Sequence, residues 1–347
     1  MWRMQGFPRA FSVEVIEVEL LCPAGTPAAL RAAVDHGADA VYLGFRDQTN
    51  ARDFPGLNFT PKQAGEAVEY AHRRGVAVLV AVNTFAQAGW VEQWRRAIDQ
   101  AADVGADAVI LADTGLLAYA AERHPGLARH LSVQASITTP EAVNFFRDHY
   151  GIERAVLPRV LSMAQVEGLA RETDVGLEVF GFGSLCVMAE GRCALSSYVT
   201  GESPNQAGVC SPSWAVQWID DDRTREARLA GVLIDRFEEG ERAGYPTLCK
   251  GRFRVGDDVY HAFESPTSLE TVSLLPRLKA AGIQAVKIEG RQRSAQYVAQ
   301  VTSMWRRALD ALNDTASAAD EETVRQTLRA LSEGTVTTLG AYERQWQ

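Results

Sequence analysis

Short apolar segments alternate with helical segments eight times along the chain, and this alternation constrains the fold more than any other sequence feature. The apolar segments are rich in Val, Ile, Leu and Ala on both faces, which is typical of parallel strands covered by helices. Strands are expected at 18–22, 40–45, 76–83, 108–113, 131–136, 155–160, 176–182 and 285–290. Eight strand–helix units predict an α/β fold, a (β/α)8 barrel of the TIM type.

The segments between the strands carry helix start and stop signals. Thr60-Pro61 and Thr139-Pro140 are typical helix starts, and Gly75, Gly105 and Gly282 are typical stops. Helices are expected at 27–36, 61–74, 90–104, 114–123, 140–150, 162–172, 268–281, 294–312 and 320–332. A doubly wound open sheet is the alternative. It predicts a GxGxxG phosphate loop after a strand, which the sequence lacks.

A long segment without clear periodicity separates the seventh and eighth strands. We therefore expect an N-terminal extension at 1–17, a barrel at 18–315 and a C-terminal helix and tail at 316–347. Within the barrel, residues 184–267 would form a cysteine-bearing insertion after strand seven.

Charge and composition narrow the class of protein. The 347 residues include 35 Lys and Arg against 44 Asp and Glu, a formal net charge of −9. Nucleic-acid binding depends on neutralising phosphates, so no nucleic-acid partner is expected. Without an apparent signal peptide or transmembrane segment, a cytoplasmic protein is expected. Cysteines stay reduced there, which favours a metal site over disulfides.

The cysteines gather in the region after strand seven. Cys186, Cys193 and Cys210 lie in a glycine-rich stretch and Cys249 follows, whereas Cys22 is distant and is interpreted as structural. None forms a CxxC pair. The spacing alone is compatible with zinc, an iron–sulfur cluster or buried free thiols. The glycines favour a loop that wraps a metal centre.

Polar residues follow or interrupt the predicted strands, and catalytic groups of such barrels lie at the carboxyl ends of the strands. The candidate catalytic residues are Glu178, Lys287 and Glu289, and the candidate substrate-binding residues are Arg52, Asn83, Gln134, Arg159, Phe180 and Arg291. Lys287 and Glu289 are charged residues at alternating positions of a buried strand. Each must therefore form an ion pair or take part in the function of the site. Arg159 is also compatible with a loop or capping role, and Phe180 with packing at the barrel top. HExxH, GxSxG and Walker motifs are absent.

The region around the cysteines resembles the signature of the collagenase-like peptidase family 32. The pattern E-x-F-x-x-G-S-L-C-x4-G-x-C-x-L-S spans 178–196, and LLCPAG at 20–25, GADAVYLG at 37–44 and KIEGR at 287–291 agree with it. The likeness is strongest to the branch of the family that acts in oxygen-independent ubiquinone biosynthesis. The segments that carry this likeness are NARDFPGLNFT (50–60), FGSLCVMAEGRCALSSYVTGESPN (182–205), LIDRFEEGERAGYPTLCKGR (233–252), SPTSLETVSLLP (265–276) and LGAYERQWQ (339–347).

This resemblance implies a 4Fe-4S cluster on Cys186, Cys193, Cys210 and Cys249, and a heterodimer with a related UbiV-type protein. It implies hydroxylation of the ubiquinone ring precursor without dioxygen, with prephenate as the suspected oxygen donor. An anionic donor would contact Lys287, Arg291, Arg159 or Arg52, because Arg pairs well with carboxylates. The alternatives are a tRNA- or rRNA-modifying hydroxylase of the same family, a collagenase-like peptidase, and a non-catalytic cluster-bearing subunit. The sequence offers no nucleophile–base pair for the peptidase.

Overall fold

The computed structural model describes residues 17–188, 190, 192–204, 210–313, 321–333 and 336–344. The predicted N-terminal extension lies outside the described residues except for Glu17, as do residues 345–347 of the predicted tail.

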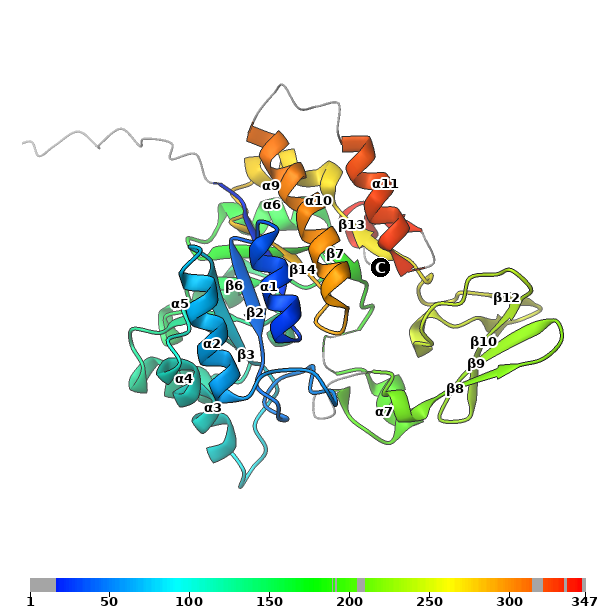
Figure 1. Ribbon diagram of the computed structural model, residues 1–347, viewed down its shortest axis with the longest axis horizontal. Coiled ribbons are helices and arrows are strands. Elements are labelled where there is room, and N and C mark those ends of the chain that lie inside the picture. Colours follow the sequence, from blue (N-terminus) through cyan, green and yellow to red (C-terminus); the bar gives the residue numbers. More distant parts are fainter. Residues whose placement is uncertain are drawn as a thin grey trace, which may run out of the picture.

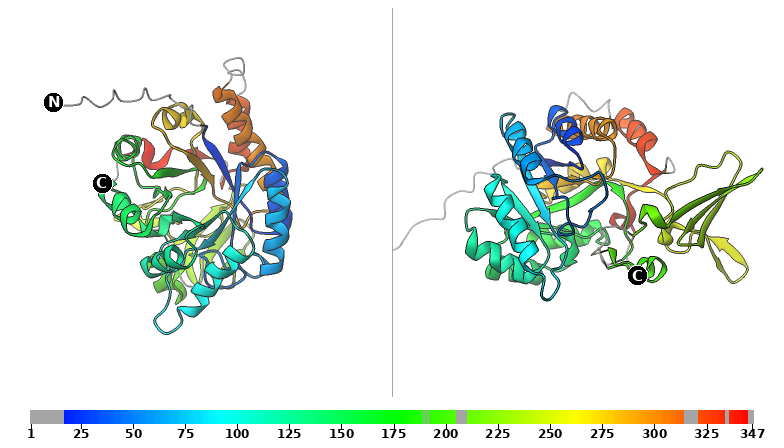
Figure 2. Two further views of the ribbon diagram at one scale, coloured as in Figure 1. Left: turned by 90° about the vertical axis from the view of Figure 1, so that its left-hand side faces the viewer. Right: turned by 60° about the horizontal axis from the view of Figure 1, so that its bottom comes forward.

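Eight parallel strands close into a barrel (Figure 2), which confirms the predicted (β/α)8 fold. Strands β1 to β7 pair in sequence order, and β14 closes the ring by pairing in parallel with both β7 and β1. The barrel strands are β1 (Glu19–Pro23), β2 (Ala40–Leu43), β3 (Ala77–Val82), β4 (Ala108–Leu111), β5 (Ala128–Leu131), β6 (Arg154–Val156), β7 (Gly176–Ser184) and β14 (Ala285–Ile288).

Helices cover the outside of the barrel and bury one apolar face each against it (Figure 1). They are α1 (Pro27–Asp35), α2 (Pro61–His72), α3 (Glu92–Asp103), α4 (Thr114–Arg123), α5 (Pro140–Tyr150), α6 (Met163–Arg171), α9 (Leu275–Ala280), α10 (Ala295–Asn313) and α11 (Glu321–Leu331). The predicted starts are confirmed at α2 and α5, where Thr60 and Thr139 cap the helix and a proline follows. In the described residues no helix is long and apolar enough to cross a membrane.

The interior of the barrel is divided into an apolar half and a charged half. Side chains from β1 to β4 form a small hydrophobic cluster that includes Leu21, Leu79 and Ile110. On the opposite side, buried polar side chains come from β5, β6, β7 and β14; they are His130, Arg154, Glu178 and Lys287. A barrel interior is normally filled by branched apolar residues, so the charged half is the part that requires explanation.

Two predicted elements are wrong in their placement. The fifth strand ends at Leu131, and the predicted strand at 131–136 is mostly a 3-10 turn over Val133–Ala135, capped by Ser132 and closed by left-handed Ser136 (φ 53°). The predicted helix at 268–281 begins only at Leu275. Its first part is instead strand β13 (Ser268–Glu270), which pairs antiparallel with the end of β7. Strand β7 extends beyond the barrel there, and its backbone groups need a partner.

The segment at 184–267, predicted as irregular, contains regular structure and projects from the barrel (Figure 1). It holds α7 (Ala194–Thr200), a three-stranded antiparallel sheet and a hairpin. The sheet strands are β8 (Val216–Asp220), β9 (Thr224–Leu229) and β10 (Val232–Glu238), and the hairpin strands are β11 (Phe253–Val255) and β12 (Asp258–Tyr260). The two ends of this insertion meet, because Ser184 of β7 pairs with Ser268 of β13. A short strand β15 (Thr337–Thr338) then pairs with β13.

Position 181 of β7 requires a glycine because side chains of β14 and α10 lie close to its backbone. A Cβ atom at this position would lie 2.2 Å from Val286 Cγ1 and 2.7 Å from the Trp305 ring. We expect Gly181→Ala to lower the free energy of unfolding by about 1–3 kcal/mol, the usual range for overpacking. At Gly65 of α2 the nearest atom is Val104 Cγ1 at 4.0 Å, so Gly65→Ala should raise that free energy by about 0.5–1 kcal/mol. Urea unfolding of both variants tests this, and equal effects would contradict the packing described here.

Candidate functional site

A cavity of about 670 Å³ lies at the carboxyl ends of the barrel strands, beneath the insertion. Every candidate site residue predicted from the sequence lines this cavity except Glu178, which is fully buried in β7. The polar residues of the cavity come from the barrel, the loops after β2, β3, β5 and β6, and the insertion. The barrel thus brings the predicted residues together from distant parts of the chain.

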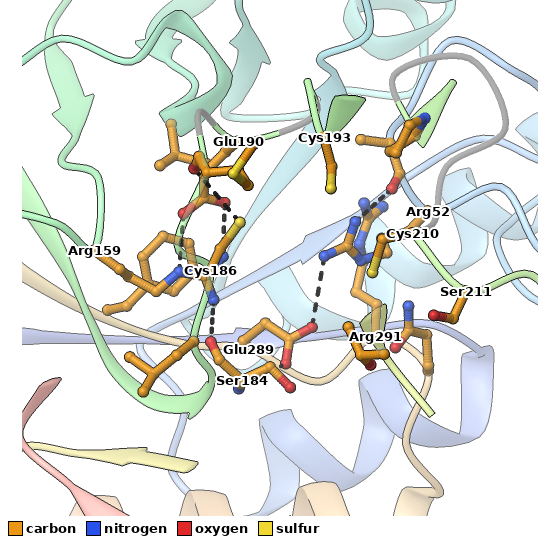
Figure 3. A pocket seen from close by; sticks show the side chains of 18 of the residues that line it. Arg52, Arg159, Ser184, Cys186, Glu190, Cys193, Cys210, Ser211, Glu289 and Arg291 are labelled. Atoms are coloured by element: carbon orange, nitrogen blue, oxygen red, sulfur yellow. Dashed lines mark hydrogen bonds and ion pairs between the residues drawn. The ribbon is translucent and has the colours of Figure 1, made fainter. Parts of the chain in front are cut away.

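The four clustered cysteines contribute to the wall that the insertion supplies. Cys186 follows β7, Cys193 caps α7, Cys210 precedes the sheet, and Cys249 lies in the 3-10 turn Leu248–Lys250. All are free thiols. Figure 3 shows Cys186, Cys193 and Cys210 around one space. Cys22 is buried away from them, where its sulfur accepts a hydrogen bond from the Thr302 hydroxyl at 3.3 Å.

The thiols are near enough to influence one another electrostatically. Burial, followed by the neighbouring thiols of Cys210, Cys186 and Cys193, raises the pKa of Cys249 to about 12. Yet no three Cys, His, Asp or Glu side chains among the described residues are grouped so that they could hold a metal ion. A tetrahedral zinc site needs its sulfurs about 4 Å apart, since each Zn–S bond is about 2.3 Å. The four thiols share the cavity, but in the described residues they do not converge on one point as the ligands of a single metal ion do.

Arg159 holds the insertion on the barrel. Its guanidinium donates to both carboxylate oxygens of Glu190, at 2.9 and 2.6 Å, and to the Ser184 carbonyl, and it stacks 4.3 Å above the Phe180 ring. Through these contacts Arg159 links the end of β6 to β7 and to the loop between Cys186 and Cys193. Glu190 was missed by the sequence reasoning, although its position between Cys186 and Cys193 was a usable signal.

Lys287 and Glu178 form an ion pair inside the barrel. Lys287 Nζ lies 2.7 Å from Glu178 Oε1 and 4.3 Å from the centre of the Tyr42 ring. Burial lowers the pKa of Lys287, and the carboxylate of Glu178 counteracts this effect. Arg154 also approaches Glu178, at 3.9 Å. Lys287 is thus held at the floor of the cavity with Glu178 beneath it.

Glu289 lies beside Ser184, with Arg159 on one side and Arg52 on the other (Figure 3). Arg52 Nη2 is 3.8 Å from Glu289 Oε1, and the Ser184 amide donates to Glu289 Oε2 at 3.4 Å. Burial raises the pKa of Glu289, but Arg52 and Arg159 are among the groups that outweigh it, and the net shift is downward. Glu289 is therefore a carboxylate at neutral pH.

Asn83 and Gln134 present amide groups from the neighbouring loops. Asn83 accepts a hydrogen bond from the Ala51 amide at 3.0 Å and donates to Ser132 Oγ at 3.4 Å. Gln134 is buried, and its Oε1 atom has no hydrogen-bond partner among the described residues. A buried amide oxygen without a partner indicates a place where a ligand or water donates.

His130 gives the barrel interior a predictable response to acid. Burial, with Arg154 and Lys287 nearby, lowers its pKa to about 3. The unfolded chain therefore binds more protons than the folded protein between about pH 3 and 6.5, and stability must rise with pH across that window. His130→Leu should flatten the slope of unfolding free energy against pH by up to about 1.4 kcal/mol per pH unit. Urea titrations at several pH values measure this, and identical slopes would show that the imidazole does not titrate as described.

Comparison with known proteins gives a family. The model of "Peptidase family U32" matches residues 25–345. An uncharacterized protease of Methanocaldococcus jannaschii is 32% identical over 308 residues, covering 86% of this chain and 67% of that protein. The tRNA hydroxylation protein P1 of Bacillus subtilis is 30% identical over 297 residues, covering 84% and 63%. The 23S rRNA 5-hydroxycytidine synthase of Escherichia coli is 31% identical over 299 residues, covering 85% and 40%.

This chain therefore spans less than two thirds of the length of some of these relatives. The family match nevertheless covers the barrel from the end of β1 onward, the insertion with its four cysteines, and the C-terminal segment. The chain belongs to peptidase family U32.

Proposed function

We propose that the chain is a UbiU-type iron–sulfur component of a cytoplasmic, oxygen-independent hydroxylase that acts on the ubiquinone ring precursor. One observation carries the proposal: four free cysteines surround a single cavity at the catalytic face of the barrel. Relatives named as hydroxylation proteins support the reaction class. We further propose that Cys186, Cys193, Cys210 and Cys249 hold a 4Fe-4S cluster.

The reaction inserts an oxygen atom into an aromatic C–H bond. Without dioxygen, a donor of the form D–OH must transfer its oxygen so that R–H and D–OH become R–OH and D–H. The ring loses two electrons and the donor gains two, so the exchange is balanced. Prephenate is the proposed donor. A bound cluster would supply one-electron redox chemistry that side chains lack.

The cavity provides suitable surroundings for both reactants. Its apolar wall contains Ile110, Val133, Val156 and Phe180, which suit an aromatic ring. Its polar wall contains Lys287 and Arg52, whose positive charges suit an anionic donor, together with the carboxylate of Glu289. Arg159 contributes by positioning, because its donors already contact Glu190 and Ser184.

The insertion also exposes apolar side chains, which supports the proposed heterodimer with a UbiV-type protein. Trp218 and Ile219 of β8 are 42% and 49% exposed, and Val232 and Leu233 of β10 are 46% and 41% exposed. Consecutive strand residues point to opposite faces, so both faces of this sheet expose apolar side chains, and exposed apolar surface is typical of protein interfaces.

RNA hydroxylation is the second candidate, because two of the relatives carry tRNA or rRNA modification in their names. The net charge of −9 disfavours it. Peptidase activity has less support, since no histidine is among the described residues that line the cavity.

A gene deletion separates these functions. A strain without this chain should fail to make ubiquinone under anaerobic growth, accumulate a ring-unhydroxylated precursor, and recover when the gene is restored. Normal anaerobic ubiquinone would refute the proposed function. Mass spectrometry of tRNA and rRNA nucleosides from the same strain tests the second candidate, which requires loss of a hydroxylated nucleoside.

A further inference from the structure

Among the described residues, every buried cation that lines the cavity has a carboxylate partner except one. Six described cationic residues line the cavity, and they are Arg52, Arg159, Lys250, Lys287, Arg291 and Arg293. Three have a carboxylate within 2.7 Å: Arg159 with Glu190, Lys250 with Glu333, and Lys287 with Glu178. Arg52 lies 3.8 Å from Glu289, and the side chain of Arg293 is exposed to solvent.

Arg291 differs from these residues. It is 5% exposed, and among the described residues no carboxylate oxygen lies within 4.0 Å of its guanidinium. Its recorded polar contact is a hydrogen bond from Nη1 to Asn50 Oδ1 at 3.1 Å. A guanidinium has five N–H donors and stays charged in proteins. The Tyr42 ring centre also lies 5.7 Å from the guanidinium carbon. A buried charge without a contacting counterion is costly, and buried charges in proteins are usually paired.

The surrounding residues hold this guanidinium in one position. Asn50 is fully buried and donates to the Phe45 carbonyl at 2.7 Å, which fixes the oxygen that Arg291 contacts. A Cβ atom at Gly44 would lie 2.8 Å from Arg291 Nη1, and one at Gly25 would lie 1.7 Å from the Arg291 carbonyl oxygen. Two glycines thus leave space for both the side chain and the backbone of Arg291. This arrangement is a preformed site rather than a solvated surface arginine.

From this geometry we propose that Arg291 binds a carboxylate group of a small organic ligand inside the cavity. A single guanidinium has one positive charge and a planar pair of donors, which match one carboxylate. The partnerless Oε1 of Gln134, which lines the same cavity, accepts a further hydrogen bond from a hydroxyl-bearing ligand. The inference rests on the proposed function, because it identifies Arg291, rather than Arg159 or Lys287, as the anchor for the donor's carboxylate.

Binding of phenylpyruvate tests the site without requiring turnover. Calorimetric titration into anaerobically purified, cluster-loaded protein should show that phenylpyruvate binds, that neutral phenylacetone binds at least about 10-fold more weakly, and that inorganic phosphate does not compete. Arg291→Gln should weaken phenylpyruvate binding about 10- to 100-fold and leave phenylacetone unchanged. Arg291→Lys should bind phenylpyruvate with an affinity between those of the unsubstituted protein and Arg291→Gln, because it keeps the charge and loses the paired donors.

Two further variants make the result specific. Arg293→Gln is the matched control, and it should bind phenylpyruvate like the unsubstituted protein. Gly44→Ala keeps the charge but displaces the guanidinium, so it should weaken phenylpyruvate binding in the same direction as Arg291→Gln.

Three results would overturn the inference. The first is no binding of phenylpyruvate at millimolar concentration. The second is an equal loss of phenylpyruvate affinity in the Arg291 and Arg293 variants. The third is loss of the cluster absorbance in Arg291→Gln, which would mean that the Arg291 charge stabilises the cluster and not a carboxylate ligand. None of them depends on ubiquinone, so a failed carboxylate site and a failed proposed function give different outcomes.

Discussion

Replacing Cys186 or Cys249 with Ala is expected to abolish iron and sulfide binding in protein purified without oxygen. The unsubstituted chain should carry about four irons and four sulfides, and each variant less than about one of either. The four thiols line one cavity, so in the proposed cluster each would bind a different iron. Removing one of these ligands should also remove binding energy that would stabilise the insertion. Iron and sulfide assays with absorbance spectra measure the effect.

Cys22→Ala is the matched control for this experiment. Cys22 belongs to β1 and is buried against Thr302 of α10, so its loss should affect packing but not metal content. Zinc without iron in the unsubstituted chain would refute the cluster, and so would full iron content in Cys249→Ala.

Replacing Lys287 with Met is expected to destabilise the protein by about 3–5 kcal/mol, because it leaves the Glu178 carboxylate buried without its nearest counterion. Glu178 is fully buried, and the side chain of Lys287 is 7% exposed. The double variant Glu178→Met/Lys287→Met should recover much of this loss, since no uncompensated charge remains. Urea unfolding gives the free energies, and the double-mutant cycle gives the coupling.

An exposed ion pair provides the comparison. Lys62 and Glu66 of α2 are 3.9 Å apart with side chains 88% and 66% exposed, so Lys62→Met should change the stability by less than about 0.5 kcal/mol. Equal effects of Lys287→Met and Lys62→Met would mean that the charged half of the barrel interior is hydrated and not dry.

The barrel could be predicted because its elements are locally encoded. Apolar strands recur in every unit, and threonine caps and glycine stops recur in several of them. The sequence GADAV also occurs twice, at 37–41 and 105–109. In both copies the aspartate, Asp39 or Asp107, accepts a hydrogen bond from the amide of a neighbouring strand residue, at 2.7 Å. The fifth strand was predicted too late in the chain because Arg129 and His130 occupy β5. Both are buried, and Arg129 donates to the carbonyls of Leu127, Tyr150 and Gly151.

The site was predictable in part for the same reason. Residues at strand ends converge in any such barrel, so the lining residues Asn83, Gln134 and Arg159 could be chosen from their positions. The carboxylate partners of the cavity's cations could not be predicted. Glu190 and Glu333 approach Arg159 and Lys250 only through the fold of the insertion and the C-terminal segment. The sheet at β8 to β10 was missed since strand β8 is largely exposed and lacks an alternating apolar pattern.

The pairing of Ser184 with Ser268 has a consequence for how this protein can change during evolution. Because the insertion leaves and re-enters the barrel at neighbouring backbone positions, its length can vary without shifting any barrel strand. Loop closure entropy grows only slowly with length, so such growth costs little stability. One barrel can therefore carry cysteine-bearing insertions of different size.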